Sequence, residues 1–286
     1  MRILVAGATG SIGLHVVNTA IKMGHQPVAL IRNKRKVKLL PQGTDIFYGD
    51  VSLPETLTEL PKDIDAIIFT LGSDGQGRIG ARAIDYGGVR NILRIFRDVS
   101  VRISLMTTIG VTERLSTWNQ RTEVHDWKRR AERLVRATGH PYTIVRPGWF
   151  DYNNDDEHRI VMLQGDRRHA GTPEDGVISR EQIAQVLVSA LTNDEAKNKT
   201  CELVAERGEA QQDLTPLFAD LQTDDPQKND GVLDIDNMPL REEPECIINE
   251  MNLYLKINQS TTLTTLSYSS QRHDSSGLYI WIYRRG

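Results

Sequence analysis

The stretch GATGSIG, residues 7–13, indicates the fold class of this 286-residue chain. It follows an apolar run, RILVA at residues 2–6, and leads into residues 11–23, where apolar side chains recur at helical spacing. Glycines in such a turn let the backbone reverse, approach a phosphate closely and pack helix against strand, while the helix start offers unpaired N–H groups to an anion. The stretch therefore predicts a strand, a nucleotide-binding turn and a helix.

Strand-like and helix-like segments alternate along the rest of residues 1–150. Apolar runs predict strands at 27–31, 45–48, 66–71, 101–107 and 142–145, and helical patterns fall near 55–60, 84–99 and 124–137. Strands that are apolar throughout, separated by helices, are typical of a parallel sheet covered on both faces. The sequence predicts an α/β fold of the Rossmann type, doubly wound with a mostly parallel sheet, in which residues 1–150 form the dinucleotide-binding core.

Residues 151–255 are expected to add the remaining strands and helices of the same domain and a small C-terminal substrate lobe. A capped helical pattern covers 179–191, strands are expected at 159–164 and 201–204, and the acidic segment 211–245 is interpreted as a surface wrap. Residues 256–286 hold ten Ser and Thr before the run LYIWIY. This composition predicts a flexible tail, with pairing of the aromatic run to a sheet edge or another chain as the alternative.

The net charge of −3 gives no reason to expect nucleic acid or a membrane as a partner, yet the charges are unevenly distributed. Residues 1–150 carry 22 Lys and Arg against 13 Asp and Glu, whereas residues 151–286 carry 13 against 25. Two interpretations are open. The basic half attracts a phosphorylated small molecule or an RNA backbone, or the two sets of charges complement one another across the fold.

Cysteine content and hydropathy exclude several classes of protein. Cys201 and Cys246 are too few and too far apart for a disulfide framework or a zinc-ligand pattern, so we expect a cytoplasmic protein without a metal site. No apolar run approaches the roughly 18 residues of a membrane span. The sequence does not indicate an oligomeric state.

The GxxGxxG spacing and several later motifs together resemble the atypical, NmrA-like, NAD(P)-binding branch of the short-chain dehydrogenase/reductase superfamily. The resemblance covers about residues 1–245. Its further motifs are Gly49-Asp50-Val51, Thr70-Leu71-Gly72-Ser73, Asp85-Tyr86-Gly87-Gly88-Val89-Arg90-Asn91, Thr107-Thr108, Lys128, Arg146-Pro147-Gly148 and Asp236-Asn237-Met238-Pro239-Leu240.

The resemblance implies a dinucleotide site spread over several strand ends. Asp50 would meet the adenine amino group with help from the backbone of Val51, although Asp50 as a plain turn residue is the alternative. Asn91 corresponds to a structural asparagine, or is a helix-surface amide. The residues expected to bind the cofactor are Gly7, Thr9, Gly10, Ser11, Ile12, Gly13, Arg32, Arg35, Asp50, Val51, Thr70, Leu71, Gly72, Lys128, Pro147 and Gly148.

The residue after the second strand favours NADP(H) over NAD(H). Sites specific for NAD place Asp or Glu there to hold the ribose 2′-hydroxyl, whereas an arginine accommodates a 2′-phosphate. This chain has Arg32 at that position, followed by Asn33 and three further cations at 34–36. Some of these residues are expected to form the solvated start of a helix instead.

The catalytic signature departs from the family pattern. Active relatives use Tyr-x-x-x-Lys on one helix face with a serine on the preceding strand. Lys128 matches the lysine, and Thr107 or Thr108 can replace the serine as a hydrogen-bond donor, but Val124 stands at the tyrosine position and has no proton to give. Tyr152, in the loop after the sixth strand, is the expected substitute, whereas the neighbouring His125 is interpreted as a surface histidine.

Two functions are consistent with this sequence. The first is an NADPH-binding oxidoreductase of the atypical short-chain type, which transfers a hydride to a small carbonyl or quinone-like substrate, with Lys128, Thr107, Thr108 and Tyr152 as catalytic residues. The second is a non-catalytic regulator that senses the NADP(H) state and acts through a protein partner, as the missing tyrosine allows. An isomerase or epimerase is not supported, because those relatives usually retain the tyrosine.

Overall fold

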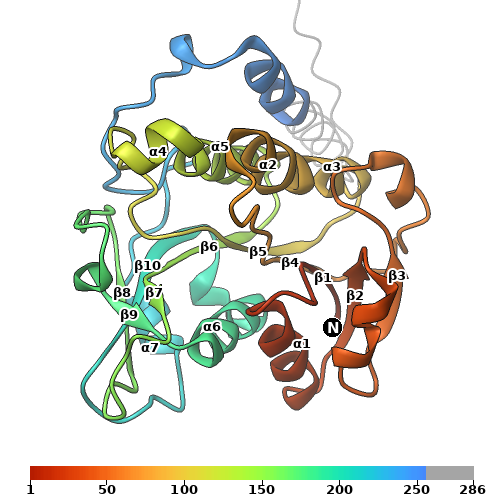
Figure 1. Cartoon of the computed structure of the whole chain (residues 1–286), viewed down its shortest axis with the longest axis horizontal. Helices are drawn as coiled ribbons and strands as arrows, with labels where there is room; N and C mark the ends of the chain where they lie inside the picture. Colours follow the sequence, from red (N-terminus) through yellow and green to blue (C-terminus); the bar gives the residue numbers. More distant parts are fainter. Residues whose placement is uncertain (256–286) are drawn as a thin grey trace, which may run out of the picture.

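The computed structural model describes residues 1–255, and the predicted tail at 256–286 lies outside them. The described part contains a ten-stranded sheet in the order β3-β2-β1-β4-β5-β6-β10-β9-β7, with β8 also pairing with β10 (Figure 1). Pairing is parallel from β3 to β10 and between β7 and β9, whereas β8 and β9 pair with β10 in the antiparallel sense. The strands are β1 (Arg2–Ala6), β2 (Gln26–Ile31), β3 (Asp45–Tyr48), β4 (Ala66–Phe69), β5 (Arg102–Met106), β6 (Tyr142–Pro147), β7 (Trp149–Phe150), β8 (Arg159–Leu163), β9 (Val177–Ile178) and β10 (Lys199–Glu206).

Helices cover both faces of the sheet, which confirms the predicted Rossmann-type fold (Figure 1). Helices α1 (Gly13–Lys22) and α6 (Arg180–Thr192) lie on one face. The other face is covered by α5 (Val124–Ala137), by the helical residues 245–255 and by one continuous helical stretch. That stretch consists of α2 (Gly77–Gly80), the π-helical turn η3 (Ala81–Tyr86) and α3 (Gly87–Ile95).

The shorter helices lie in the connections between these elements. Two of them are α-helical and the others are 3₁₀ turns. They are η1 (Lys34–Leu39), η2 (Pro54–Leu57), α4 (Thr117–Thr122), η4 (Pro173–Asp175), η5 (Asp194–Ala196), α7 (Thr215–Ala219) and η6 (Leu240–Glu242).

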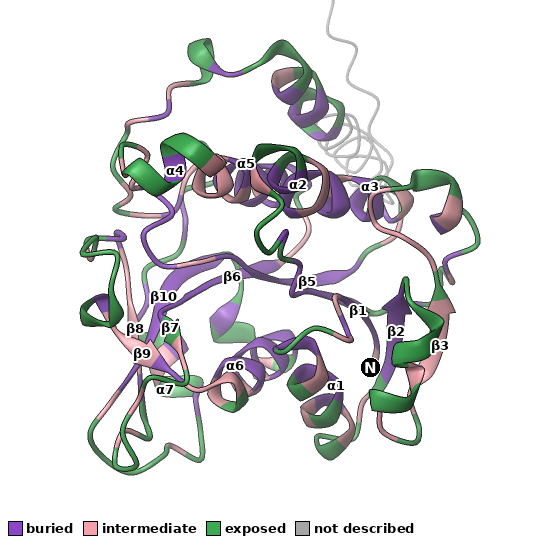
Figure 2. Cartoon of the chain, viewed as in Figure 1, coloured by how far each residue is buried: buried purple, intermediate pink, exposed green. Residues whose placement is uncertain are grey.

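Strand β1 shows how the sheet divides the core in two. Ile3 and Val5 pack with α1 and α6, whereas Leu4 and Ala6 pack toward α3 and α5, because successive side chains of a strand point to opposite faces. All four are fully buried (Figure 2). Burying one such Leu or Ile side chain contributes roughly 1.5–3 kcal/mol, so both apolar layers stabilise the fold.

The residues beyond 150 extend the same sheet. Strand β10 pairs in parallel with β6, and β8 folds back against β10 through the register Leu203↔Met162. Capping fixes the start of α6: the Ser179 hydroxyl accepts the N–H of Gln182, whose side chain accepts the N–H of Ser179. No helix among residues 1–255 is long and apolar enough to cross a bilayer.

Buried ion pairs between the two halves of the chain explain much of the uneven charge distribution. Residues 224–243, which we call the acidic strap, lie over α5 (Figure 1). The strap residue Asp230 receives hydrogen bonds from Arg129 at 3.0 Å and from Arg133 at 2.8 and 2.7 Å. Both guanidinium groups are at least 98% buried. The structure thus favours the second interpretation, in which basic residues of the first half complement acidic residues of the second.

A third buried arginine connects α5, the sheet and the acidic strap. The guanidinium of Arg146, on β6, is fully buried among three carboxylates: Glu132 at 2.7 Å, Asp234 at 2.7 Å and Glu202 at 3.1 Å. Because an unpaired buried charge is costly, each partner depends on the others. The motif Asp236-Asn237-Met238-Pro239-Leu240 belongs to this strap, and the Met238 carbonyl accepts a 2.6 Å hydrogen bond from Arg133.

Candidate active site

The glycine turn forms a cradle between β1 and α1. Gly7 has φ +94°, and a Cβ there would lie 2.7 Å from the Thr70 carbonyl oxygen. A Cβ on Gly13 would lie only 2.0 Å from the Gly7 carbonyl oxygen, so the first and third glycines permit close backbone packing. Gly10 is exposed, and its N–H donates to the Gly7 carbonyl at 2.9 Å. Thr9 is half-buried.

The start of α1 is open toward this cradle. Its N-cap residue, Ile12, supplies no side-chain acceptor for the first-turn N–H groups, and Ser11 is exposed. Uncapped N–H groups at a helix N-terminus, together with the helix dipole, favour binding of phosphate. The residues present therefore fit the pyrophosphate of a dinucleotide.

Arg32 and Asp50 meet at the carboxyl ends of β2 and β3. Arg32 Nη1 lies 3.6 Å from Asp50 Oδ2, with the arginine side chain 67% exposed. Asp50 also accepts hydrogen bonds from the backbone N–H and hydroxyl of Ser52, at 2.9 and 2.7 Å. Burial raises the pKa of Asp50, but these hydrogen bonds and the Arg32 charge outweigh it and leave the pKa lowered. The structure thus places one cation and one ionised acceptor where adenosine is expected, while Arg35 is exposed in η1.

The crevice wall is completed by residues that follow β3 and β4. Asn91 donates to the Val51 carbonyl at 2.8 Å and is 4% exposed, so it is a structural asparagine rather than a surface amide. A Cβ on Gly88 would lie 2.8 Å from Leu71 and 3.0 Å from Val51, which shows that the start of α3 touches both. Gly72 continues the chain beyond Leu71.

Lys128 reaches the same end of β4 from α5. Its Nζ lies 2.8 Å from the Asp85 Oδ1 and 3.4 Å from the Leu71 carbonyl oxygen. The Asp85 side chain is fully buried, and the Lys128 side chain is 11% exposed. Sequence reasoning identified the lysine but not this partner. The available signal was that Asp85 is the one acidic residue of the helical stretch 77–95, because a buried acid requires a cation or donors.

The two threonines after β5 have different environments. The Thr107 hydroxyl donates to Glu132 at 2.6 Å, and the residue is 3% exposed. The structure therefore corrects the expectation that Thr107 can assist catalysis, because its proton is used in the buried network around Glu132. Thr108 is half-buried, and its hydroxyl donates to the Ile109 carbonyl at 3.1 Å.

Val124 and His125 begin α5. Val124 lies four residues before Lys128 in the same helix, as the spacing predicts, so the two share a helix face. His125 is half-buried rather than freely exposed: Nδ1 lies 3.2 Å from the Glu113 carbonyl oxygen, and the centroids of the His125 and Trp118 rings lie 4.9 Å apart. Burial lowers the pKa of His125.

The residues after β6 are positioned by backbone contacts. The N–H of Gly148 donates to the Leu203 carbonyl at 2.9 Å, and a Cβ there would lie 2.4 Å from the Gly176 carbonyl oxygen. Pro147 is buried as the last residue of β6. Tyr152 is 62% exposed and its ring stacks edge-on against Trp149, so the structure gives it no contact with Lys128.

Comparisons with known proteins identify the family of the chain. A family model described as NAD(P)H-binding matches residues 7–194. The chain is 26% identical to sanguinarine reductase from Eschscholzia californica, covering 78% of this chain and 97% of that protein. It is also 26% identical to the photosystem II assembly factor Ycf39 from Synechocystis, covering 72% of this chain and 63% of that protein's length.

Solved structures show the same fold. The oxidoreductase ylbE from Lactococcus lactis has a TM-score of 0.60 at 18% identity and covers 77% of this chain and 95% of that one. The anaerobilin reductase ChuY from Escherichia coli O157:H7 has a TM-score of 0.57 at 21% identity and covers 74% and 100%. Because the family model spans more than half of the chain, and its start coincides with the glycine cradle, the expectation of NADP(H) as cofactor is confirmed at the level of the family. The chain belongs to the NAD(P)H-binding family whose model matches residues 7–194.

Proposed function

We propose that this protein is an NADP(H)-dependent reductase of the atypical, NmrA-like type that acts on a small carbonyl or quinone-like molecule. The bound cofactor supplies the hydride. The observation that carries the proposal is the position of Lys128, whose ammonium is held by Asp85 beside the carboxyl end of β4. That edge of the sheet also carries the glycine cradle.

The preference for NADP(H) rests on Arg32. Its guanidinium is 67% exposed and lies over Asp50, and no acidic residue occupies the position after β2. A charge-assisted hydrogen bond to a 2′-phosphate is worth roughly 1.5–3 kcal/mol. We therefore expect NADPH to bind about ten- to a hundredfold more tightly than NADH.

The chain's own groups divide the remaining tasks. Lys128 donates to the ribose hydroxyls of the dinucleotide, and Asp85 keeps its ammonium in place. Because Val124 has no proton to give, an unactivated ketone loses general-acid assistance worth about 10²–10⁴ in rate. A good substrate is then one whose reduced form is already stabilised, such as a quinone, or one protonated by Thr108, Tyr152 or water.

A second candidate is a non-catalytic NADP(H)-binding regulator that acts through a protein partner. Two observations favour it: Val124 replaces the expected acid, and one relative is a photosystem assembly factor rather than a named reductase. In either case we propose a cytoplasmic location.

Oxidation of NADPH by the purified protein against a panel of quinones and aldehydes distinguishes the candidates. Turnover that is lost in Lys128→Met supports the reductase, and tight NADPH binding without turnover on the panel supports the regulator. Failure to bind NADPH contradicts both. If the wild type reduces simple ketones at about 1–10³ s⁻¹ and Val124→Tyr changes nothing, the missing acid has no consequence.

A further inference from the structure

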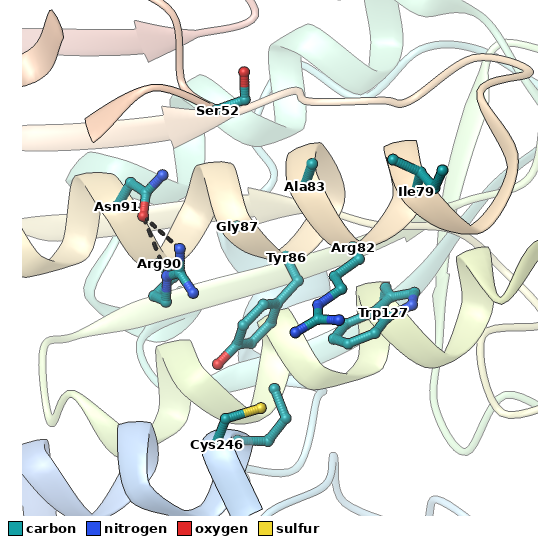
Figure 3. Close-up of a pocket in the computed structure, with 11 residues that line it drawn as sticks. Ser52, Ile79, Arg82, Ala83, Tyr86, Gly87, Arg90, Asn91, Trp127 and Cys246 are labelled. Carbon is teal, nitrogen blue, oxygen red and sulfur yellow. Dashed lines mark hydrogen bonds between the residues drawn. The ribbon is translucent and has the colours of Figure 1, made fainter. Parts of the chain in front are cut away.

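A cavity lies against the helical stretch 77–95, between this stretch, α5 and residues 245–255 (Figure 3). Its volume is about 440 Å³. None of the glycine-cradle residues lines it. Tyr86 and Trp127 line it, whereas their chain neighbours Asp85 and Lys128 form the ion pair of the candidate active site. The two helices therefore contribute to both sites.

Four arginines and a tyrosine recur every four residues along the helical stretch 77–95, at positions 78, 82, 86, 90 and 94. The outer two are paired: Arg78 Nε lies 3.4 Å from Glu123, and Arg94 forms a salt bridge with Glu250. The inner two, at positions 82 and 90, both line the cavity. Neither forms an ion pair with any of residues 1–255.

The two inner guanidinium groups contact only neutral groups. Arg90 donates to the side-chain oxygen of Asn91 at 3.1 and 2.9 Å, and Arg82 lies 5.7 Å from the centroid of the Trp127 ring. Arg82 is exposed and Arg90 half-buried. The two positive charges at the cavity therefore have no carboxylate partner among residues 1–255, whereas Arg78 and Arg94 each have one. This surplus favours an anionic ligand.

Tyr86 adds a buried donor to the same wall. The residue is 3% exposed, and its hydroxyl has no hydrogen-bond partner among the described residues. Its ring lies between Arg82 and Arg90 along the helix (Figure 3). Burial raises the pKa of Tyr86, which keeps the hydroxyl protonated and able to donate. A buried hydroxyl without a partner is costly, and an acceptor from a ligand would remove that cost.

Apart from Ser52 and Asn91, the rest of the lining is mainly apolar. Ile79, Ala83 and Ile247 contribute aliphatic surface, and Ile79 is 84% exposed. We propose that this cavity is a binding site for a small organic anion, a carboxylate with an apolar body. The carboxylate is held by Arg82 or Arg90 and the Tyr86 hydroxyl, and the apolar body covers the aliphatic wall.

Cys246 makes the cavity directly measurable. It is exposed and lines the cavity, whereas the chain's other cysteine, Cys201, is fully buried. Alkylation by iodoacetamide under native conditions therefore reports on Cys246 alone. Protection of Cys246 requires neither NADPH nor turnover, so it tests the proposal independently of the proposed reductase function.

The probe is 2-naphthoate, and 2-naphthamide is its neutral match. We expect 2-naphthoate to slow alkylation of Cys246 saturably and 2-naphthamide to protect much less. Arg82→Gln and Arg90→Gln should each weaken protection about tenfold or more, since each removes a charge-assisted contact. Arg97→Gln is the matched control, because Arg97 is exposed, pairs with Asp98 and lies outside the cavity.

Tyr86→Phe keeps the ring and removes only the hydroxyl, so a weaker but still saturable protection is expected from it. NADPH binding by each variant shows that the variant is folded. Three results would overturn the proposal: no protection by millimolar 2-naphthoate, equal protection by the amide, or full protection in the folded double variant Arg82→Gln/Arg90→Gln.

Discussion

The ammonium of Lys128 lies 2.8 Å from the carboxylate of Asp85, in a pair that joins α5 to the π-helical turn η3. Lys128 is the lysine of a Tyr-x-x-x-Lys pattern whose tyrosine position holds Val124. In this chain the lysine is therefore oriented by a buried acid from another helix. The pair has structural and functional consequences that can be measured separately.

Breaking this pair should destabilise the fold. Asp85→Asn or Lys128→Met should each lower the free energy of unfolding by about 3 kcal/mol, because each leaves a largely buried partner unpaired. The double variant should lose much less than the sum, which a double-mutant cycle in urea measures. The exposed Arg97–Asp98 pair is the control, and its coupling should be much smaller. Additive losses at Asp85 and Lys128 would show that they do not interact in solution.

Arg32→Ala should weaken NADPH binding about ten- to a hundredfold and leave NADH binding nearly unchanged, because only NADPH carries the 2′-phosphate. Fluorescence titration of both cofactors measures this. Lys38→Ala, an exposed cation further along η1, serves as the control for general loss of positive charge. Equal losses for NADPH and NADH would place Arg32 elsewhere than at the 2′-phosphate.

Substitutions at two glycines of the cradle should have different effects, one on cofactor binding and the other on stability. Gly10 is exposed, and a Cβ on it would meet only the Gly7 carbonyl oxygen, at 3.2 Å, so Gly10→Val should fold and lose cofactor binding. A Cβ on Gly13 would meet that same oxygen at 2.0 Å, so Gly13→Ala should lower the melting temperature. Thermal melts with and without NADPH separate the effects. Normal binding by Gly10→Val would mean that the turn is only structural.

The acidic strap should be essential for stability. Asp230→Asn removes the only carboxylate paired with Arg129 among residues 1–255 and leaves Arg133 with Glu243 at 4.0 Å, and we expect a loss of about 3–5 kcal/mol. Asp236→Asn is the matched control, since Asp236 is an exposed strap residue and its replacement should cost less than about 0.5 kcal/mol. Urea denaturation compares them, and similar losses in both variants would contradict the proposed role of the buried pairs.

Stability should also depend on pH through Glu202. Burial raises its pKa from 4.5 to about 7, against the opposing charge of Arg146. The folded chain then binds more protons than the unfolded chain between these values, so the free energy of unfolding falls as the pH rises from about 4.5 to 7, by about 3 kcal/mol at most. Glu202→Gln should reduce this dependence of the free energy of unfolding on pH, which urea titrations at several pH values measure. An unchanged slope between pH 4.5 and 7 in that variant would assign the slope to another group.

Carboxylates of the acidic strap should show the opposite dependence at lower pH. Burial raises the pKa of Asp230, but Arg133 and Arg129 outweigh it and hold the pKa well below its usual range. Its contribution is present above the unfolded pKa of about 4 and is lost as the pH falls below that value.

The parts of the fold that depend on neighbouring residues could be predicted from the sequence. The bounds of α5 are those that its spacing predicts, and the glycine turn lies where RILVA and the following helix place it. Periodicity and turn chemistry are local, so one sequence suffices for them.

The parts that depend on distant pairs could not be predicted. Arg146 has partners at positions 132, 202 and 234, and Asp85 pairs across 43 residues with Lys128. A charged residue in a sequence is ordinarily solvated, and the local sequence does not identify the distant partner of a buried one. The same reason explains why Thr107 was expected in the site, although Glu132 accepts its proton.

The long-range pairing of Arg146 constrains the order in which the chain is able to fold during its synthesis. Strand β6 leaves the ribosome well before Asp234, which follows 88 residues later, so the nascent sheet holds a guanidinium that lacks one of its carboxylates. At roughly 5–20 residues per second, that interval lasts several seconds. A polypeptide cut before the strap would keep Glu132 and Glu202 beside Arg146 but would lack Asp230 and Asp234, so buried arginines of the nucleotide-binding half would lose carboxylate partners.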